Sequence, residues 1–230
     1  RLLDKNGNDL AHGGAALANL TTIDINTMDP ALKNVAITAA CDVTNPLCGQ
    51  QGASFIFAPQ KGADPDMVLK LDAALWHLAD ISAEALGKDF RDQPGAGAAG
   101  GLGFAFAAYL HGCLRPGVDI VLDAVLPEEQ LQDADIVVTG EGRFDGQTAM
   151  GKAPVGIARR AKAHGCKVFV LAGSVEPEGA HTLQKDKPLV DGVFSILPGV
   201  LSLEDAMREE IAYENMRFTA EQVFRIVAGR

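Results

Sequence analysis

The sequence contains no apolar run of the roughly 18 to 20 residues that a membrane-spanning helix requires, and its first residues lack a signal-peptide pattern. It also lacks an excess of basic residues, because 20 Lys and Arg stand against 30 Asp and Glu, which gives a net charge of −10. General nucleic-acid binding is therefore disfavoured, since it depends on clustered positive charge. We expect neither a membrane nor a nucleic acid as a partner.

The cysteine spacing that is typical of zinc sites is also missing, because no two cysteines form a Cys-x-x-Cys pair. We interpret all four cysteines as free thiols, a usage that fits a cytoplasmic location. They are Cys41, Cys48, Cys113 and Cys166. Hydrophobic residues make up 47% of the 230 positions and charged residues 22%. This balance indicates a globular chain with one or two domains and enough apolar residues for a core.

One stretch in the second half of the chain has the clearest pattern. The apolar run Ile136–Val138 predicts a strand buried on both faces, and the spacing of apolar residues over 154–161 predicts a helix. Lys167–Leu171 predicts a second strand. Together these elements form a βαβ unit with parallel strands. The connection after the first strand then lies at the carboxyl end of the sheet, where open α/β sheets bind ligands.

This connection is rich in charged residues and glycine. It combines carboxylates that can hold Mg²⁺ with cations that can hold a phosphate or a carboxylate. The candidate catalytic residues are Glu141, Arg143, Asp145 and Lys152, and of these Glu141 and Asp145 are the candidate metal ligands. Candidate binding positions nearby are Gly140, Gly142, Gly151 and Ser174. The alternative is an ordinary solvated loop, although functional residues favour loops of this kind.

Gly146–Lys152 has the spacing Gly-x-x-x-x-Gly-Lys, which begins a Walker A phosphate-binding loop. The match is incomplete, because Ala153 replaces the Ser or Thr that binds Mg²⁺, and residues 140–145 separate the predicted strand from the first glycine. We therefore reject a P-loop NTPase. We keep the weaker expectation that backbone N–H groups and Lys152, close to a helix start, favour an anion.

The first half of the chain predicts strands at residues 20–25 and 34–40 and an amphipathic helix that starts at Asp64. Asp42 and Asn45 follow the second of these strands, and Lys61 lies in a later loop; all three are candidate binding residues. Asp and Asn beside a proline also cap turns, so a structural role for the first two stays open.

Residues 93–103 form a second glycine-rich segment, in which Gly95, Gly97 and Gly100 match Gly-x-Gly-x-x-Gly. The dinucleotide-binding fingerprint needs a strand immediately before this pattern, and the sequence predicts none there. A nicotinamide oxidoreductase is therefore disfavoured. Gly95 and Gly97 stay candidates for ligand binding, with close packing of the apolar helix predicted at 102–111 as the alternative.

The predicted elements indicate a domain boundary near residue 127. Residues 118–126 form either a strand or a helix, whereas residues 128–230 contain the βαβ unit, a third strand predicted at 192–197 and one or two closing helices. Three parallel strands are fewer than the roughly five or six of a typical sheet. We therefore expect an earlier segment of a longer protein to complete the sheet.

Three motifs, in this order along the chain, resemble the bacterial glycerate kinase family of the glycerate 2-kinase type. They are Cys-Asp-Val-Thr-Asn-Pro-Leu at 41–47 with Ala-Pro-Gln-Lys-Gly-Ala at 58–63, Gly-Ala-Gly-Ala-Ala-Gly-Gly-Leu-Gly at 95–103, and Val-Val-Thr-Gly-Glu-Gly-Arg-Phe-Asp-Gly-Gln-Thr-Ala-Met-Gly-Lys-Ala-Pro at 137–154. The resemblance implies a two-domain α/β fold. Residues 1–127 would be most of an inserted α/β domain and residues 128–230 the carboxyl-terminal part of a flavodoxin-like domain with a parallel sheet, the family's amino-terminal part being missing.

The same resemblance implies phosphorylation of D-glycerate to 2-phosphoglycerate with ATP and Mg²⁺ as cofactors. Lys152 and Arg143 would hold phosphate or the glycerate carboxylate, and Glu141 or Asp145 would bind Mg²⁺ or accept the hydroxyl proton. The candidates of the first half would line the opposite wall of a cleft between the domains. A homodimer is left open as the assembly. The alternative function is a non-catalytic α/β module that binds small organic acids or nucleotides.

Overall fold

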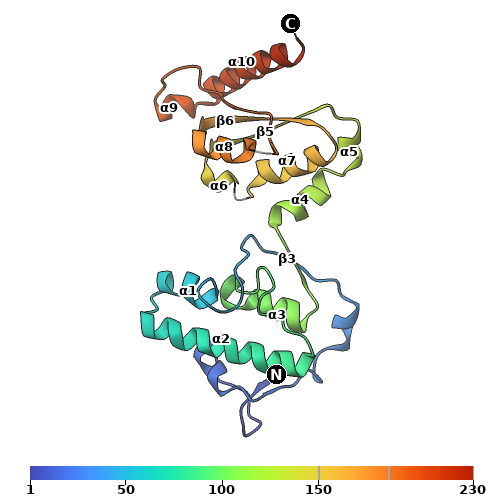
Figure 1. The fold of residues 1–230 in the computed structure, drawn as a ribbon, viewed down its shortest axis with the longest axis vertical. Helices are drawn as coiled ribbons and strands as arrows, with labels where there is room; N and C mark the ends of the chain where they lie inside the picture. Colours follow the sequence, from blue (N-terminus) through green and yellow to red (C-terminus); the bar gives the residue numbers. More distant parts are fainter. Residues whose placement is uncertain (150, 186, 230) are drawn as a thin grey trace. The chain divides into compact units, whose positions relative to one another are not determined.

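The computed structural model describes residues 1–149, 151–185 and 187–229. The chain forms two compact units, Arg1–Gly117 and Val118–Arg230, which follow one another along the ribbon in Figure 1. Each unit has hydrophobic core clusters of its own, one in the first and two in the second.

Unit 1 is built around a long helix, α2 (Pro65–Leu86), with the shorter helices α1 (Ala53–Phe57) and α3 (Leu102–Tyr109). Its strands are short: β1 (Leu2–Leu3) pairs antiparallel with β2 (Thr22–Ile23), and β3 (Thr38–Ala40) pairs parallel with β4 (Cys113–Arg115). Four 3-10 turns connect these elements: η1 (Gly14–Asn19), η2 (Pro30–Asn34), η3 (Pro59–Lys61) and η4 (Ala98–Gly100).

Local sequence sets both ends of α2. The Asp64 side chain accepts a 2.8 Å hydrogen bond from the Met67 backbone N–H, and Pro65 takes a first-turn position, where a backbone N–H has no helical partner to lose. Gly87 ends the helix in the left-handed conformation, with φ of 69°. The helix predicted to start at Asp64 is therefore confirmed, and its buried side packs Leu75 and Leu78 into the core of unit 1.

The two strands predicted in the first half are shorter than expected, because only Thr22–Ile23 and Thr38–Ala40 pair with other strands. The Asp29 carboxylate accepts a 2.8 Å hydrogen bond from Ala31 N–H, and Pro30 begins η2. This capped turn holds the intervening backbone in a helical conformation, so the extended segment starts only after it.

Unit 2 contains one parallel sheet with the strand order β5-β6-β7 among its described residues. The strands are β5 (Ile136–Phe144), β6 (Lys167–Val175) and β7 (Gly192–Ser195). The βαβ unit and the third parallel strand are thus confirmed, but β5 and β6 extend well beyond the apolar runs that predicted them. Ile136–Val138 is also not buried on both faces as predicted, because Val138 is exposed. The helices of this unit are α4 (Gly117–Val125), α5 (Glu129–Gln132), α6 (Gly146–Ala149), α7 (Ala153–Ala163), α8 (Pro177–Gln184), α9 (Leu203–Ala206) and α10 (Glu209–Val227).

Helices cover both faces of this sheet. Val168, Val170 and Ala172 of β6 belong to a core cluster with residues of α7 and α8, whereas Phe169 and Leu171 pack with Val223 of α10. Figure 1 shows α7 and α8 on one side of β5 and β6 and α10 on the other. Apolar residues on both faces are what a buried parallel strand requires. In the described ranges, none of the helices combines the length and apolarity that crossing a membrane demands.

The segment 118–126, for which the sequence left a strand or a helix open, lies largely in helix α4, and it packs with unit 2. The Arg160 guanidinium of α7 donates to the Asp119 carbonyl over 3.0 Å and pairs with the Asp123 carboxylate. A Cβ at Gly156 of α7 would lie 2.8 Å from a Val118 methyl group, so the glycine lets the two helices approach closely. These contacts explain why the compact units divide after Gly117, ahead of the boundary expected near residue 127.

Candidate functional site

The backbone of residues 139–144 at the candidate site is a strand. These residues were predicted as a loop, yet they continue β5, in which Glu141 pairs with Ala172 and Arg143 with Ser174. A Cβ at Gly140 would lie 2.4 Å from the Leu171 carbonyl oxygen, so glycine allows the two backbones to pair this closely. Glu141 and Arg143 are therefore held on a strand, and the connection to α7 starts only at Asp145.

Asp145 is fixed by the short helix that follows it. Its Oδ1 accepts hydrogen bonds from the Thr148 backbone N–H at 3.1 Å and from the Thr148 hydroxyl at 3.4 Å. In return, the Asp145 backbone N–H donates to Thr148 Oγ1 over 3.2 Å. Thr148 has no solvent-exposed surface. The Asp145 carboxylate thus caps α6 through a reciprocal set of contacts.

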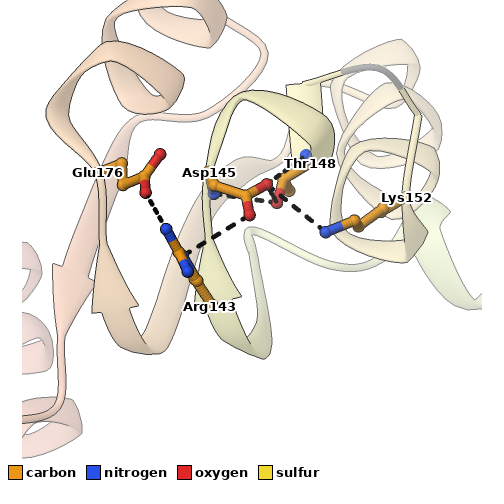
Figure 2. A network of polar contacts seen from close by, with 5 residues as sticks. All are labelled: Arg143, Asp145, Thr148, Lys152 and Glu176. Carbon is orange, nitrogen blue, oxygen red and sulfur yellow. Dashed lines mark hydrogen bonds and ion pairs between the residues drawn. The ribbon is translucent and has the colours of Figure 1, made fainter.

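Two cations flank this carboxylate, as Figure 2 shows. Lys152 Nζ lies 3.5 Å from Asp145 Oδ1, and Arg143 Nε lies 3.8 Å from Oδ2. Arg143 also donates to Glu176 Oε1. The hydrogen bond and the charge of Glu176, with a smaller contribution from Asp145, raise the pKa of the Arg143 guanidinium above its usual value. Positive and negative groups therefore alternate along this end of the sheet.

Lys152 occupies the N-cap position of α7, a helix of 11 residues. The amino-terminal end of a helix carries a partial positive charge and unpaired N–H groups, so it favours an anion. Gly151, immediately before it, has a φ of 119° that side-chain-bearing residues rarely adopt. Glycine at this position lets the chain turn from α6 into α7 and brings Lys152 back toward Asp145.

Glu141 differs from the other charged residues of the site. It pairs with Ala172, which belongs to the core cluster beneath α7 and α8, so its side chain starts on the covered face of β5. Its Oε1 is shielded from solvent and has no hydrogen-bond partner. Burial of a carboxylate oxygen without a donor is unfavourable, so this atom is suited to a cation or to a hydroxyl group. Within the described ranges, no three His, Cys, Asp or Glu side chains form a metal-binding group.

Two functional candidates, Thr148 and Glu176, are missing from the sequence interpretation. Thr148 is the third residue after Asp145, a spacing typical of capped helix starts. Glu176 directly precedes Pro177, which begins α8, and its backbone N–H donates to the Phe144 carbonyl over 2.8 Å. The capping pattern could have pointed to Thr148, whereas only the paired strands bring Glu176 beside Arg143.

The remaining candidates of unit 2 lie on the neighbouring strands. Ser174 is exposed on β6 opposite Arg143. Gly142 on β5 has open space where a side chain would start. Gln147, which the sequence places in the same segment, has a side chain outside the described structure.

In unit 1, Asp42 and Asn45 both make structural hydrogen bonds. Asp42 Oδ1 accepts from the Gly117 backbone N–H at 2.8 Å, and Asn45 Nδ2 donates to the Gln51 carbonyl over 2.8 Å. Lys61 is exposed at the end of η3 and lines a shallow hollow of about 130 Å³ with Ser54 and Phe57. These three residues belong to a different unit from Asp145, and the cleft expected between the domains stays a prediction.

Gly95 and Gly97 bring two backbone segments of unit 1 into close contact. Gly95 has a φ of 88°, and a Cβ there would lie 2.8 Å from Cys41 Sγ; a Cβ at Gly97 would lie 2.2 Å from the Pro46 carbonyl oxygen. Both glycines are therefore needed where residues 93–103 pack on residues 41–46. This explains them by close packing against residues 41–46, whereas the alternative that the sequence left open was packing of the helix at 102–111.

One of the two grounds for rejecting a Walker A loop at residues 146–152 is wrong. Because β5 extends to Phe144, it reaches almost to Gly146, and the expected separation between strand and glycine is wrong. Residues 146–149 form a helical turn, however, in the place where a phosphate-binding loop would wrap around its ligand. This turn and Ala153 are the grounds on which a P-loop is excluded.

Taken together, these features define an α/β protein with a mixed-charge site at the carboxyl end of a parallel sheet. A family model described as the glycerate kinase family matches residues 1–228. The chain belongs to this family, as the motifs at 41–63, 95–103 and 137–154 predicted.

Named relatives are similar over nearly the whole chain. The chain is 48% identical over 223 residues to a glycerate kinase of Bacillus subtilis (strain 168), which covers 97% of this chain and 57% of the relative. It is 45% identical over 216 residues to a glycerate 2-kinase of Escherichia coli (strain K12), covering 94% of this chain and 55% of the relative. The chain thus spans little more than half the length of these relatives.

A solved structure supports the same fold. The crystal structure of a protein assigned as glycerate kinase 2 from Salmonella typhimurium LT2 matches with a TM-score of 0.75 and 44% identity. The match covers 100% of this chain and 58% of that one. The expected glycerate-kinase-like α/β fold with a parallel sheet is therefore confirmed.

Proposed function

We propose that this chain is part of an enzyme that transfers a phosphoryl group from ATP to D-glycerate and forms 2-phosphoglycerate. The relatives named above carry the glycerate kinase part of the proposal. The observation in this chain that supports it most directly is the grouping of Arg143, Asp145 and Lys152 at the end of β5. Phosphoryl transfer depends mainly on positioning and charge neutralisation, and this grouping supplies charges of both signs.

Arg143 and Lys152 would hold the anionic groups of the substrates. Their side chains are 67% and 43% exposed, so an arriving phosphate or carboxylate can reach both. Arg143 can bind a carboxylate or phosphate through two N–H groups, whereas Lys152 contributes a compact charge at the start of α7. We assign glycerate or phosphate binding to this pair.

The residues present fit a magnesium ion. Mg²⁺ usually binds through one or two carboxylates together with substrate phosphates and water, and the unpaired Glu141 Oε1 and the Asp145 carboxylate provide two such groups. When bound, the ion would neutralise charge on the transferred phosphate. Whichever of Glu141 and Asp145 does not hold the ion can accept the proton of the glycerate hydroxyl.

Unit 1 would supply the second part of the substrate site. We propose that it corresponds to most of an inserted domain and that unit 2 is the carboxyl-terminal part of a flavodoxin-like domain. Lys61 is a residue of unit 1 that can contact an anion, because it is exposed and beside a hollow. Asp42, Asn45, Gly95 and Gly97 were predicted as binding residues, and we propose that they shape the backbone of that site. A cytoplasmic location and a homodimer complete the proposal.

The decisive assay measures ADP formation with D-glycerate and Mg²⁺ present together and with each omitted. Coupling to enolase identifies the product, because enolase uses 2-phosphoglycerate and leaves 3-phosphoglycerate unchanged. Lys152→Ala should lower kcat/KM by about 100-fold or more. The matched control is Arg159→Ala, which removes an exposed cation from the same helix and should leave the rate within about twofold.

The alternative function predicts a different set of results. A binding module would bind nucleotide or glycerate with the same dependence on Lys152 but would form no ADP. ADP formation that needs no glycerate would contradict the proposed acceptor.

A further inference from the structure

We propose that Thr148 is a positioning residue: it holds the Asp145 carboxylate in place so that Arg143 and Lys152 can turn from Asp145 to an arriving phosphate. The inference rests on the anion site of the proposed function. Thr148 itself need not touch substrate, since it is completely buried.

The contacts of Asp145 with Thr148 differ in strength from its contacts with the two cations. Those to Thr148 are hydrogen bonds of 3.1, 3.2 and 3.4 Å made inside the fold. Those to the cations are ion pairs of 3.5 and 3.8 Å to side chains that are 43% and 67% exposed. Exposed ion pairs of this length contribute little free energy, because solvent screens them. Lys152 and Arg143 can therefore leave Asp145 for a phosphate more easily than the Asp145 carboxylate can leave Thr148.

The backbone contacts around Asp145 also indicate that this residue is fixed. A Cβ at Gly179 of α8 would lie 2.7 Å from the Asp145 carbonyl carbon, so α8 packs directly against this residue. The Thr148 carbonyl accepts from the Gly151 N–H at 3.1 Å and from the Lys152 N–H at 3.4 Å. Thr148 thus links the fixed carboxylate to the start of the segment that carries the movable lysine (Figure 2).

Loss of the Thr148 hydroxyl should make the Asp145 carboxylate compete with phosphate for Arg143 and Lys152. Without the hydroxyl, Asp145 Oδ1 loses one hydrogen bond and the Asp145 backbone N–H loses its acceptor. The carboxylate is then less restrained and can close on Lys152 and Arg143. The Asp145 carboxylate would then neutralise both cations, and phosphate from solution would bind less tightly.

The test is a titration of the purified chain with inorganic phosphate, followed through the backbone amide NMR signals of Gly151 and Lys152. Thr148→Val keeps the shape of the side chain and removes the hydroxyl, and it should raise the Kd for phosphate about threefold to tenfold, the range expected for one net hydrogen bond. Thr148→Ser restores the hydroxyl and should bring the Kd back to within about twofold of the original value.

A second comparison separates positioning from a general structural effect. In an Asp145→Asn background the competing charge is gone, so Thr148→Val should no longer change the Kd. An effect of equal size in that background would overturn the inference, and so would an unchanged Kd for Thr148→Val alone. If the original chain binds phosphate and the Thr148 effects appear but no ADP is formed, the proposed reaction fails and the inference stands. No phosphate binding by the original chain would remove the anion site and the inference with it.

Discussion

At the scale of single residues, two carboxylates of the site, Asp145 and Glu141, are in opposite states. Asp145 accepts hydrogen bonds from Thr148 and faces two cations, whereas the buried Glu141 Oε1 has no partner. A protein tolerates an unsatisfied buried oxygen where a ligand supplies what is missing. Of these two carboxylates, Glu141 is therefore the one whose role is explained less by folding and more by a ligand.

Glu141→Gln tests this difference. The substitution removes a negative charge that is partly shielded from water, so the melting temperature of the unliganded protein should stay the same or rise. ADP formation should fall by about 100-fold or more, because a neutral amide holds Mg²⁺ poorly and accepts no proton. Glu178→Gln, at an exposed position of α8, is the control and should change neither quantity. A clear drop in melting temperature would show that Glu141 stabilises the fold instead.

At the scale of elements, the carboxyl end of β5 shows what the sequence could and could not predict. Ile136–Val138 predicted a strand, but the polar residues that follow have no apolar pattern, and two glycines among them argue for a loop. They form a strand because β6 pairs alongside, with a Cβ at Gly173 only 2.6 Å from the Gly142 carbonyl oxygen. Pairing of this kind is tertiary and cannot be found in a local pattern.

The residues of the candidate site, like the strand β5, were predicted from the sequence only in part. Composition and spacing identified Arg143, Asp145 and Lys152, which the structure groups through ion pairs. Glu176 was not among the predicted site residues, and it joins them because β6 and the start of α8 carry it there. Local charge patterns thus identify the residues of one segment but not their partners from another.

Close packing of α8 gives a prediction at this scale. A Cβ at Gly179 would lie 2.7 Å from the carbonyl carbon of Asp145, which is backbone and cannot swing away. Gly179→Ala should therefore displace the Asp145 turn, lower the melting temperature by several degrees and weaken phosphate binding. Gly199→Ala is the control, since nothing lies within 4 Å of its added Cβ. Phosphate binding that survives Gly179→Ala unchanged would mean that the turn tolerates the shift.

Asp191, directly before β7, connects α7 with β6 and makes the stability of unit 2 depend on pH. Its Oδ2 accepts hydrogen bonds from Lys162 Nζ at 2.5 Å and from the Val168 N–H at 2.6 Å. Partial burial raises the pKa of Asp191, but these hydrogen bonds and the nearby lysine charges outweigh it, so the pKa is lower than usual. A lowered folded-state pKa stabilises the protein above the unfolded pKa of about 3.9 and loses this effect as the pH falls toward the folded value.

Asp191→Asn should therefore reduce the free energy of unfolding at pH 7. The difference from the original protein should stay constant down to about pH 5 and shrink as the pH falls through about 3.9. Chemical denaturation at a series of pH values measures this difference. A difference that grew on acidification would contradict the direction of the pKa shift.

At the scale of the whole molecule, the two units have separate cores. The core of unit 1 gathers around Leu47, Leu75 and Phe104, and that of unit 2 around Phe144 and Val170. Although the family relatives are nearly twice as long, each unit of this chain encloses apolar clusters that its own residues form. Separate cores favour separate unfolding.

The single tryptophan allows this separation to be measured. Trp76 lies on α2, with the Arg91 guanidinium 4.7 Å from the centre of its ring, so its fluorescence reports on unit 1. Val170→Ala creates a cavity at a fully buried position of β6 and should destabilise unit 2 by about 2 kcal/mol. The part of the circular dichroism transition that belongs to unit 2 should move to lower urea concentration, while the Trp76 transition stays in place. Equal movement of both signals would show that the two units unfold as one cooperative body, and the separate cores would then not act independently.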